Sequence, residues 1–330
     1  MNTRANEIMI EVEGITKMYG DILALDNVTF QLRRGEVLGF LGPNGAGKTT
    51  LMKILTCFIA PTKGKAKVAG IDVFGNTLEI RRKVGYLPEN APLYVDMQVR
   101  EFLKFVADVR DIPGAEKKRA IDRVIQTCGL SDVTEQEIRI LSKGYRQRVG
   151  LAQAMIHNPE ILVLDEPGSG LDPNQIVEIR ELIKSIGQER TVILSTHNLA
   201  EVQATARRVV IIHEGRLVAD GNPQELESNR GGARYDVVLG EAKNEQDKVR
   251  EVFMGIDGVR EVELPKIGDR DELTVIVRGT GDKDVRSHIF RSVVDANWIL
   301  LGMGRKQVDL EAIFRRLTKN GSPASSRKQQ

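Results

Sequence analysis

The segment GPNGAGKT, from Gly42 to Thr49, combines the residue types and the spacing needed to bind a phosphate group. It fits the pattern GxxxxGK[ST] and lies between a predicted strand, Val37 to Leu41, and a predicted helix, Thr50 to Phe58. Glycines let successive backbone N–H groups turn toward one anion, and the helix start adds about half a positive charge. Lys48 supplies a full charge to the β- and γ-phosphates, and the Thr49 hydroxyl is a ligand for Mg²⁺. The alternative is a glycine-rich turn without a ligand, but the complete motif in this context favours a phosphate site.

A second set of polar residues, Asp165, Glu166 and His197, follows two apolar runs, ILVLDEP and RTVILSTH. Because ligand sites of open α/β sheets lie at the carboxyl ends of the strands, we expect these side chains beside the phosphate loop. Asp165 can hold Mg²⁺ directly or through water, and Glu166 can take a proton from an attacking water. A neutral His197 can donate to a γ-phosphate oxygen. The alternative is that the two carboxylates only cap or solvate a strand end. The other histidines are interpreted as structural or solvated: His157, His213 and His288.

Positioning these residues requires a sheet, and the chain from Ile8 to Asp220 has the matching pattern. Short runs rich in Val, Ile and Leu alternate with amphipathic stretches, which is typical of strands and helices around a buried, largely parallel sheet. The strongest strand patterns cover residues 35–42, 159–167, 190–197 and 207–215. Residues from about 90 to 157 are rich in helical periodicity and poor in strands, so they predict a helical insert.

The C-terminal third has a different organisation. A glycine-rich, charged stretch around residues 228–234 predicts a linker. From YDVVL to WILLGMGR the pattern is βαββαβ, followed by a helical segment, DLEAIFRRLT, and this order predicts a small ferredoxin-like domain. We therefore expect a first domain over residues 1–230, an accessory domain over 231–318 and a disordered tail over 319–330.

The composition fits an ordinary globular protein and gives no reason to expect a nucleic-acid partner. Apolar residues make up 41% of the 330 residues, charged residues make up 28%, and the net charge is +2. The two cysteines, Cys57 and Cys128, form no CxxC or disulfide framework, so a reducing, cytoplasmic setting is expected. No apolar signal region starts the chain, and no apolar run approaches the roughly 18 residues that span a bilayer. Action at a membrane would therefore need another subunit to span it.

The segment LSKGYRQRVGLAQAM, beginning at Leu141, predicts a helix whose start can hold an anion. Ser142 and Gly144 lie at its N-terminus, where free N–H groups and a hydroxyl are offered to a negative group. The alternative reading, that Ser142 only caps its own helix, is compatible with the first. Capping would hold in an open form and the anion contact in a closed one.

Five ordered motifs, the phosphate loop, LSKGYRQR, ILVLDEP, SGLD and STH, resemble the nucleotide-binding subunit of an ABC transporter. The resemblance covers about two thirds of the chain. It is strongest to the gliding-motility type and to multidrug exporters of the ABC-2 type, which often have an accessory C-terminal domain. It implies an α/β fold with the P-loop NTPase core of the ABC ATPase type and a helical insert, plus a small C-terminal α+β ferredoxin-like domain.

The resemblance also implies an ATPase that uses ATP and Mg²⁺, forms a head-to-tail homodimer and drives separate transmembrane permease subunits. Such a protein is cytoplasmic and peripheral on the inner face of the cell membrane. Each signature segment would close on the nucleotide of the partner copy. The implied ATP-contacting residues are Gly42, Pro43, Asn44, Gly45, Ala46, Gly47, Lys48, Thr49 and Thr50 of one copy, with Ser142, Lys143 and Gly144 of the other.

Several roles are implied by the resemblance alone. Tyr19 matches the aromatic residue that stacks on adenine, with an exposed tyrosine at a strand end as the alternative. Asp172 matches the loop that crosses the dimer seam. Glu89 stands where most of the superfamily has a glutamine that contacts the metal and leads toward the membrane partner. Lys143 and Tyr145 depart from the glycine and glutamine of the LSGGQ signature, and solvent exposure or packing is the favoured reading for both.

Other classes of ATPase fit less well. A soluble ABC protein of translation would carry two nucleotide domains, and this chain has one phosphate loop. A chromosome-organising ATPase would place a long coiled coil between loop and signature, where only roughly 90 residues lie. A nucleotide-sensing scaffold without hydrolysis is the remaining alternative, and a phosphate-release assay separates it from an ATPase.

Overall fold

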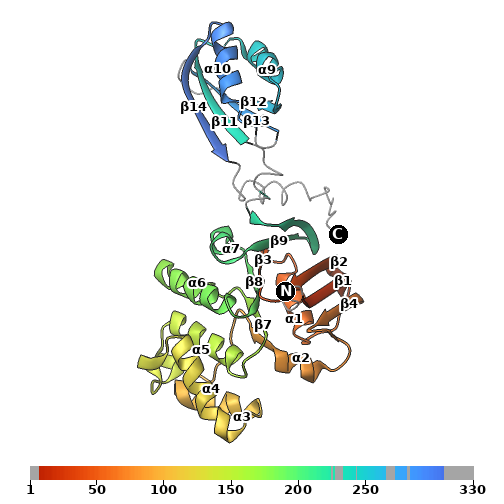
Figure 1. Cartoon of the computed structure of the whole chain (residues 1–330), viewed down its shortest axis with the longest axis vertical. Coiled ribbons are helices and arrows are strands. Elements are labelled where there is room, and N and C mark those ends of the chain that lie inside the picture. Colours follow the sequence, from red (N-terminus) through yellow and green to blue (C-terminus); the bar gives the residue numbers. More distant parts are fainter. Residues whose placement is uncertain are drawn as a thin grey trace, which may run out of the picture. The chain divides into compact units, whose positions relative to one another are not determined.

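The computed structural model describes residues 7–223, 226, 233–242, 244–264, 272–280 and 283–307. The chain divides into two compact units between Asp220 and Gly221, and each unit is described by itself (Figure 1). The predicted domain boundary at residue 230 lies outside the described residues and stays a prediction.

The first unit contains a six-stranded sheet with the strand order β10-β9-β3-β8-β7-β6. The strands from β9 to β6 pair with their neighbours in parallel. Every residue of β3, β7 and β8 is buried, which explains why they read as nearly continuous apolar runs rather than as alternating patterns. The four strands expected from the sequence are confirmed. The bounds are β3 Val37–Leu41, β6 Val84–Leu87, β7 Ile161–Asp165, β8 Thr191–Thr196, β9 Arg208–His213 and β10 Arg216–Gly221.

A separate sheet, with the strand order β2-β1-β4-β5, is antiparallel throughout. One largely parallel sheet was expected from the sequence, and this second, antiparallel sheet was not predicted. The chain reverses between β1 and β2 within two residues, and Gly20 has the positive φ of +57° that such a tight turn favours. The two sheets share a core that includes Leu25, Phe30 and Phe40. The bounds are β1 Ile8–Tyr19, β2 Ile22–Arg33, β4 Lys63–Val68 and β5 Ile71–Asp72.

The predicted helical insert is confirmed, because residues 99–155 contain helices and no strand. It comprises α3 Val99–Val109, α4 Gly114–Thr127 and α5 Lys143–Met155, with short 3₁₀ turns at Ser131–Val133 and Ile138–Ile140. A capping box between Gln98 and Glu101 fixes the start of α3. The other helices of this unit are α1 Lys48–Leu55, α2 Thr77–Lys83, α6 Pro173–Gly187 and α7 Leu199–Thr205.

The second unit has the expected βαββαβ order and the strand order β12-β13-β11-β14, which is the ferredoxin-like arrangement. Tyr235, Phe253 and Trp298 pack in its own hydrophobic core. The bounds are β11 Ala233–Gly240, α9 Gln246–Met254, β12 Val259–Glu263, β13 Glu272–Gly279, α10 Arg286–Asp295 and β14 Ile299–Gln307. The predicted helix DLEAIFRRLT and the predicted tail over 319–330 lie outside the described residues.

Candidate functional site

The glycine-rich loop lies between the end of β3 and the start of α1 (Figure 1). Gly45 and Gly47 have φ angles of +80° and +105°, in the left-handed region that favours glycine. A methyl group on Gly47 would lie 2.6 Å from the carbonyl oxygen of Ala24, so this position has no room for a side chain. No side chain caps the start of α1. Its first N–H groups therefore remain available to an anion.

Replacing Gly47 by alanine should lower both stability and nucleotide affinity. The positive φ and the clash with Ala24 would cost about 1–3 kcal/mol, which corresponds to a loss of affinity of about 5- to 150-fold if the loop absorbs the strain. Thermal unfolding and titration with a fluorescent ATP analogue measure the two effects. Gly114→Ala is the matched control, because open space surrounds that position. Unchanged affinity in Gly47→Ala would exclude the loop as the phosphate site.

Lys48, the first residue of α1, is only 5% exposed and turns back into the loop. Its Nζ donates to the carbonyl oxygens of Gly42 at 2.6 Å and of Pro43 at 3.2 Å. The same Nζ lies 3.1 Å from Oε1 of Glu166. Three oxygen partners satisfy a nearly buried ammonium. An incoming phosphate would compete with Glu166 for this charge.

Asp165 and Glu166 lie at the carboxyl end of β7, beside the end of β8, because Asp165 pairs with Ser195 in the parallel register. The Ser195 hydroxyl donates to Oδ1 of Asp165 and accepts from the Glu166 N–H at 3.1 Å. Glu166 has a φ of +49°, which is uncommon for a residue other than glycine and is often found at functional sites. This turn carries the Glu166 carboxylate toward Lys48 and away from the strand.

The Glu166 carboxylate joins Lys48 to His197. Its Oε2 lies 2.8 Å from Nδ1 of His197, and its side chain is 9% exposed, whereas the His197 side chain is 54% exposed. A largely buried carboxylate held between an ammonium and an exposed imidazole is well placed to accept a proton from water. The structure thus brings together four of the predicted residues: Lys48, Asp165, Glu166 and His197.

Two residues beside this cluster were missed from the sequence, Ser195 and Glu201. Glu201, in α7, accepts a hydrogen bond from the Thr196 hydroxyl at 2.8 Å, and its carboxylate lies against Gly168. Burial raises the pKa of the Glu201 carboxyl, and the nearby charge of Glu166 raises it further. For Ser195, the available signal was the pair of hydroxyl residues that follows the apolar run VIL.

The signature segment forms the start of α5. Ser142 is exposed, and its hydroxyl accepts from the Tyr145 N–H at 3.3 Å, so Ser142 caps its own helix. Lys143 is exposed and lies so close to Gly170 that a side chain there would overlap its ammonium. Gly144 is buried against Gln175 of α6. Across the described residues, no hydrogen bond or ion pair joins Ser142 to the phosphate loop.

The remaining predicted residues are Asp172, Glu89 and Tyr19. The Asp172 carboxylate caps α6 by accepting from the Gln175 N–H at 2.9 Å. Glu89 is exposed, and its Oε1 accepts from the Ser169 hydroxyl at 3.3 Å, so it lies beside the loop that leads to Asp172. Tyr19 ends β1 with 46% exposure, and Nζ of Lys17 lies 5.1 Å from its ring centre. Because Lys17 lies over one face of the Tyr19 ring, a base would have to stack on the opposite face.

The protein side chains near the phosphate loop supply only some of the ligands that a metal ion needs. Within the described ranges, no group of three or more His, Cys, Asp and Glu residues is arranged to hold a metal ion. Oδ2 of Asp165 is nevertheless buried without a hydrogen-bond partner, and Thr49 at the start of α1 is exposed. An orphaned carboxylate oxygen and a free hydroxyl fit a Mg²⁺ ion that takes its other ligands from phosphate and water.

A strand, a glycine-rich loop with a buried lysine, and acidic residues at a neighbouring strand end define a P-loop nucleotide triphosphatase. The family model for ABC transporters matches residues 25–169. The daunorubicin resistance ATP-binding protein DrrA3 of Streptomyces coeruleorubidus is 34% identical over 94% of this chain and 95% of its own length. The chain belongs to the family of ABC transporter ATP-binding proteins, and it is an ATP-binding, ATP-hydrolysing subunit.

Further similarities support this assignment. The bacitracin transport ATP-binding protein BcrA of Bacillus licheniformis is 41% identical over 64% of this chain and 69% of its own length. The ATP-binding cassette MJ0796, solved as a dimer in a post-hydrolysis state with ADP and Pi, superposes with a TM-score of 0.60 at 25% identity, over 65% of this chain and 98% of that one.

Among the described residues, no helix is both long and apolar enough to cross a bilayer.

Proposed function

We propose that two copies of this chain close head-to-tail around two ATP molecules and thereby drive a separate membrane permease. The observation that carries this proposal is the start of α5, where Ser142 offers a hydroxyl and the helix offers free N–H groups, without a bond to the phosphate loop of its own chain. In a two-fold dimer, each such helix start would meet the nucleotide bound by the partner. The similar cassette MJ0796 is described as a dimer, which supports the pairing of two copies.

In the proposed site, Gly42 to Thr50 bind the phosphates of ATP, and Lys48 leaves Glu166 to bind the β- and γ-phosphates. Glu166, once freed from Lys48, takes a proton from the attacking water. His197 holds Glu166 through their contact of 2.8 Å until ATP binds, and the single ring N–H of the neutral imidazole then donates to a γ-phosphate oxygen instead. Thr49 and Asp165 would hold Mg²⁺, with Glu89 as a further candidate, and the ion would offset the negative charge of the phosphates.

Tyr19 should contribute to nucleotide affinity by stacking on the base. Tyr19→Ala should weaken ATP binding by about 1–3 kcal/mol, the usual size of an aromatic stack, while Tyr19→Trp should retain binding. Equilibrium titration with ATP and GTP measures the effect. Stacking uses the ring face, so both nucleotides should lose affinity alike. If Tyr19→Ala binds ATP as the unchanged chain does, another residue contacts the base.

The membrane partner and the direction of transport are proposed from the relatives. Their names include a bacitracin transport, a daunorubicin resistance and a multidrug transporter protein, so we propose export of the ABC-2 type. The chain would then act in the cytoplasm, on the inner face of the membrane, with permease subunits docked over Glu89 and the insert helices.

Phosphate release by the purified chain tests the enzymatic part of this proposal. We expect release that requires both ATP and Mg²⁺, and that rises more steeply than linearly with protein concentration, because the working site forms only in the dimer. Tight ATP binding without release would favour the nucleotide-sensing scaffold instead.

A further inference from the structure

A cavity of about 550 Å³ lies where α2, the segment that joins α3 to α4, α4 itself and residues 156–158 come together. Its lining includes Arg82, Arg110, Arg119 and Arg123, and we therefore call it the arginine pocket. The volume falls within the range of small-ligand sites, roughly 300–1,000 Å³. None of the lining residues belongs to the candidate nucleotide site, so the arginine pocket is a separate feature of the first unit.

The four guanidinium groups of the arginine pocket are not neutralised by the protein. Within the described residues, none of them forms an ion pair, although Asp111 and Glu116 also line the cavity. By contrast, Arg100 of the same insert forms ion pairs with Asp122 and Glu135, both at 3.2 Å. Four guanidiniums against two carboxylates leave a surplus of two positive charges in the lining, and this surplus is available to a negatively charged ligand.

The stability of α4 does not explain the positions of Arg119 and Arg123. The two residues lie four positions apart, where like charges on one helix face repel each other, and neither lies in the last turn, where the helix dipole favours a cation. Nη2 of Arg123 donates to the carbonyl oxygen of Ile156 at 2.9 Å, which leaves its charge without a counter-ion. The Arg119 side chain is exposed and forms no hydrogen bond or ion pair in the part of the chain that the structure describes. A ligand explains this pair of arginines better than the fold does.

His157, which also lines the arginine pocket, responds to this positive charge. Its Nε2 lies 3.1 Å from the carbonyl oxygen of Val84 and therefore carries the ring hydrogen, because a carbonyl only accepts. Its Nδ1 is buried without a hydrogen-bond partner. Burial, followed by the charge of Arg110, lowers the pKa of His157 to about 4, so the ring is neutral at pH 7. An anion in the pocket would offset the arginine charges and change the environment of this ring.

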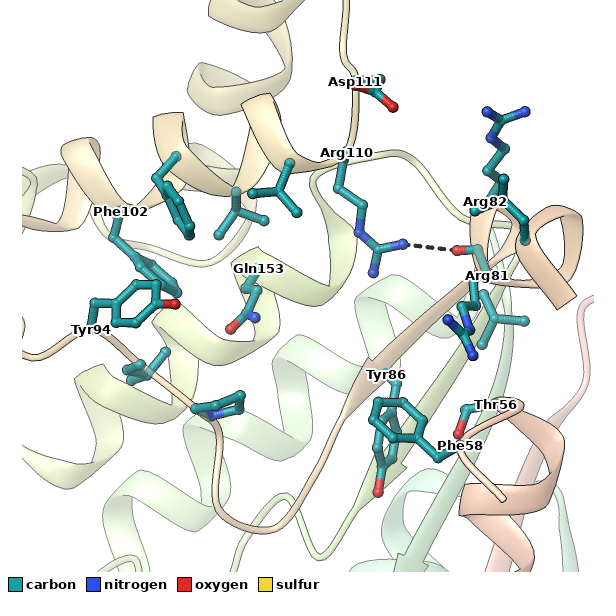
Figure 2. Close-up of a pocket in the computed structure, with 17 residues that line it drawn as sticks. Thr56, Phe58, Arg81, Arg82, Tyr86, Tyr94, Phe102, Arg110, Asp111 and Gln153 are labelled. Carbon is teal, nitrogen blue, oxygen red and sulfur yellow. Dashed lines mark hydrogen bonds between the residues drawn. The ribbon is translucent and has the colours of Figure 1, made fainter. Parts of the chain in front are cut away.

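The arginine pocket also lies where the insert contacts the rest of the first unit. Nη1 of Arg110, directly after α3, donates to the carbonyl oxygen of Arg81 in α2 at 2.9 Å (Figure 2). Arg82 belongs to α2 as well, whereas Arg119 belongs to α4 of the insert. A ligand bound by Arg82 and Arg119 would therefore bridge α2 and the insert.

We propose that the arginine pocket binds an anion with two or more phosphate groups, either a soluble polyphosphate or the headgroup of an acidic lipid. A phosphate group carries up to two charges and three acceptor oxygens, so it satisfies more guanidinium donors than a carboxylate does. A cavity of about 550 Å³ holds more than one such group, because the five heavy atoms of a phosphate occupy only a few times the roughly 30 Å³ of a water molecule. The site is separate from the phosphate loop and does not depend on the proposed function.

Titration of the full chain with inorganic pyrophosphate tests the proposal. NMR of chains labelled with ¹³C in the histidine rings separates the two anion sites, because His157 lines the arginine pocket and His197 lies beside the phosphate loop. We expect the His157 signals to shift as pyrophosphate is added. Arg119→Gln should raise the dissociation constant measured at His157 about tenfold, since it removes a charged donor, and should leave the response of His197 unchanged.

Arg207→Gln is the matched control, because Arg207 is an exposed arginine that lies outside the arginine pocket and has no ion pair within the described chain. This variant should bind pyrophosphate as the unchanged chain does. Pyrophosphate that shifts the His197 signals alone, or a His157 response indifferent to Arg119→Gln, would overturn the proposal. Thermal unfolding verifies that both variants remain folded.

Once pyrophosphate binding at His157 is established, vesicle flotation distinguishes the two sources of phosphate. A lipid headgroup predicts that the chain floats with vesicles of phosphatidylcholine and cardiolipin, which carries two phosphate groups, and not with phosphatidylcholine alone. Arg119→Gln should then abolish flotation. A soluble polyphosphate predicts pyrophosphate binding without flotation, and flotation that survives Arg119→Gln would rule out the lipid source.

Discussion

ATP turnover should fall at least about a hundredfold when Glu166 is replaced by glutamine, because a positioned general base typically contributes about 10²–10⁴-fold. Glutamine keeps the size of the side chain but cannot accept the proton of the attacking water. ATP binding should survive and even strengthen, since Lys48 would no longer share its charge with the carboxylate 3.1 Å away. The closed dimer should accumulate, because the γ-phosphate that holds it together is not removed.

Phosphate release, ATP titration and light scattering measure these three consequences of Glu166→Gln. Glu181→Gln serves as the control, because Glu181 is an exposed glutamate of α6 whose ion pair, to Lys184, is local. If Glu166→Gln instead lost ATP binding and kept its turnover per bound nucleotide, the carboxylate would have a role in binding rather than in proton transfer.

A glutamate in place of Ser142 should block the ATP-driven dimer. Ser142 starts α5, and the N–H groups there would face the γ-phosphate held by the partner. A carboxylate at that point repels phosphate, by about 4 kcal/mol for two unit charges 4 Å apart at an effective dielectric constant of 20. The monomer should still bind ATP, since its own phosphate loop is unchanged.

Light scattering with and without ATP measures the loss of the dimer, and phosphate release measures the loss of turnover that follows from it. Ser131→Glu is the matched control, because Ser131 is an exposed serine at the start of a 3₁₀ turn in the same insert. Full turnover by a monomeric Ser142→Glu chain would rule out a shared site.

The phosphate loop was predictable because its chemistry is local. Gly42 to Thr49 are contiguous, and their flanking strand and helix follow directly from apolar runs. Asp165, Glu166 and His197 were predictable for a related reason, since each ends a buried parallel strand and parallel strands end at one edge. In contrast, the antiparallel sheet was not predicted as a separate sheet, although the 12-residue strand β2 alternates buried and exposed residues over much of its length, as antiparallel strands with one solvated face do.

The missed features depend on contacts between distant residues. The Lys48 to Glu166 ion pair and the position of Glu201 against Gly168 depend on the turn after β7 and on the packing of α7. The contact between Arg81 and Arg110 is a further example, since a strand, a loop and a helix separate the two residues along the chain before they meet through one hydrogen bond (Figure 2). The sequence identifies each of these residues but not its neighbours in space.

A mixing experiment tests the shared site most directly. Glu166→Gln and Ser142→Glu chains, each inactive alone, would form mixed dimers in which one pocket has an intact Glu166 from one chain and an intact Ser142 from the other. The mixture should then release phosphate at up to about a quarter of the unchanged rate, since half of the random dimers would carry one working pocket of two. A mixture no more active than the average of its two components would contradict a nucleotide site built from both copies.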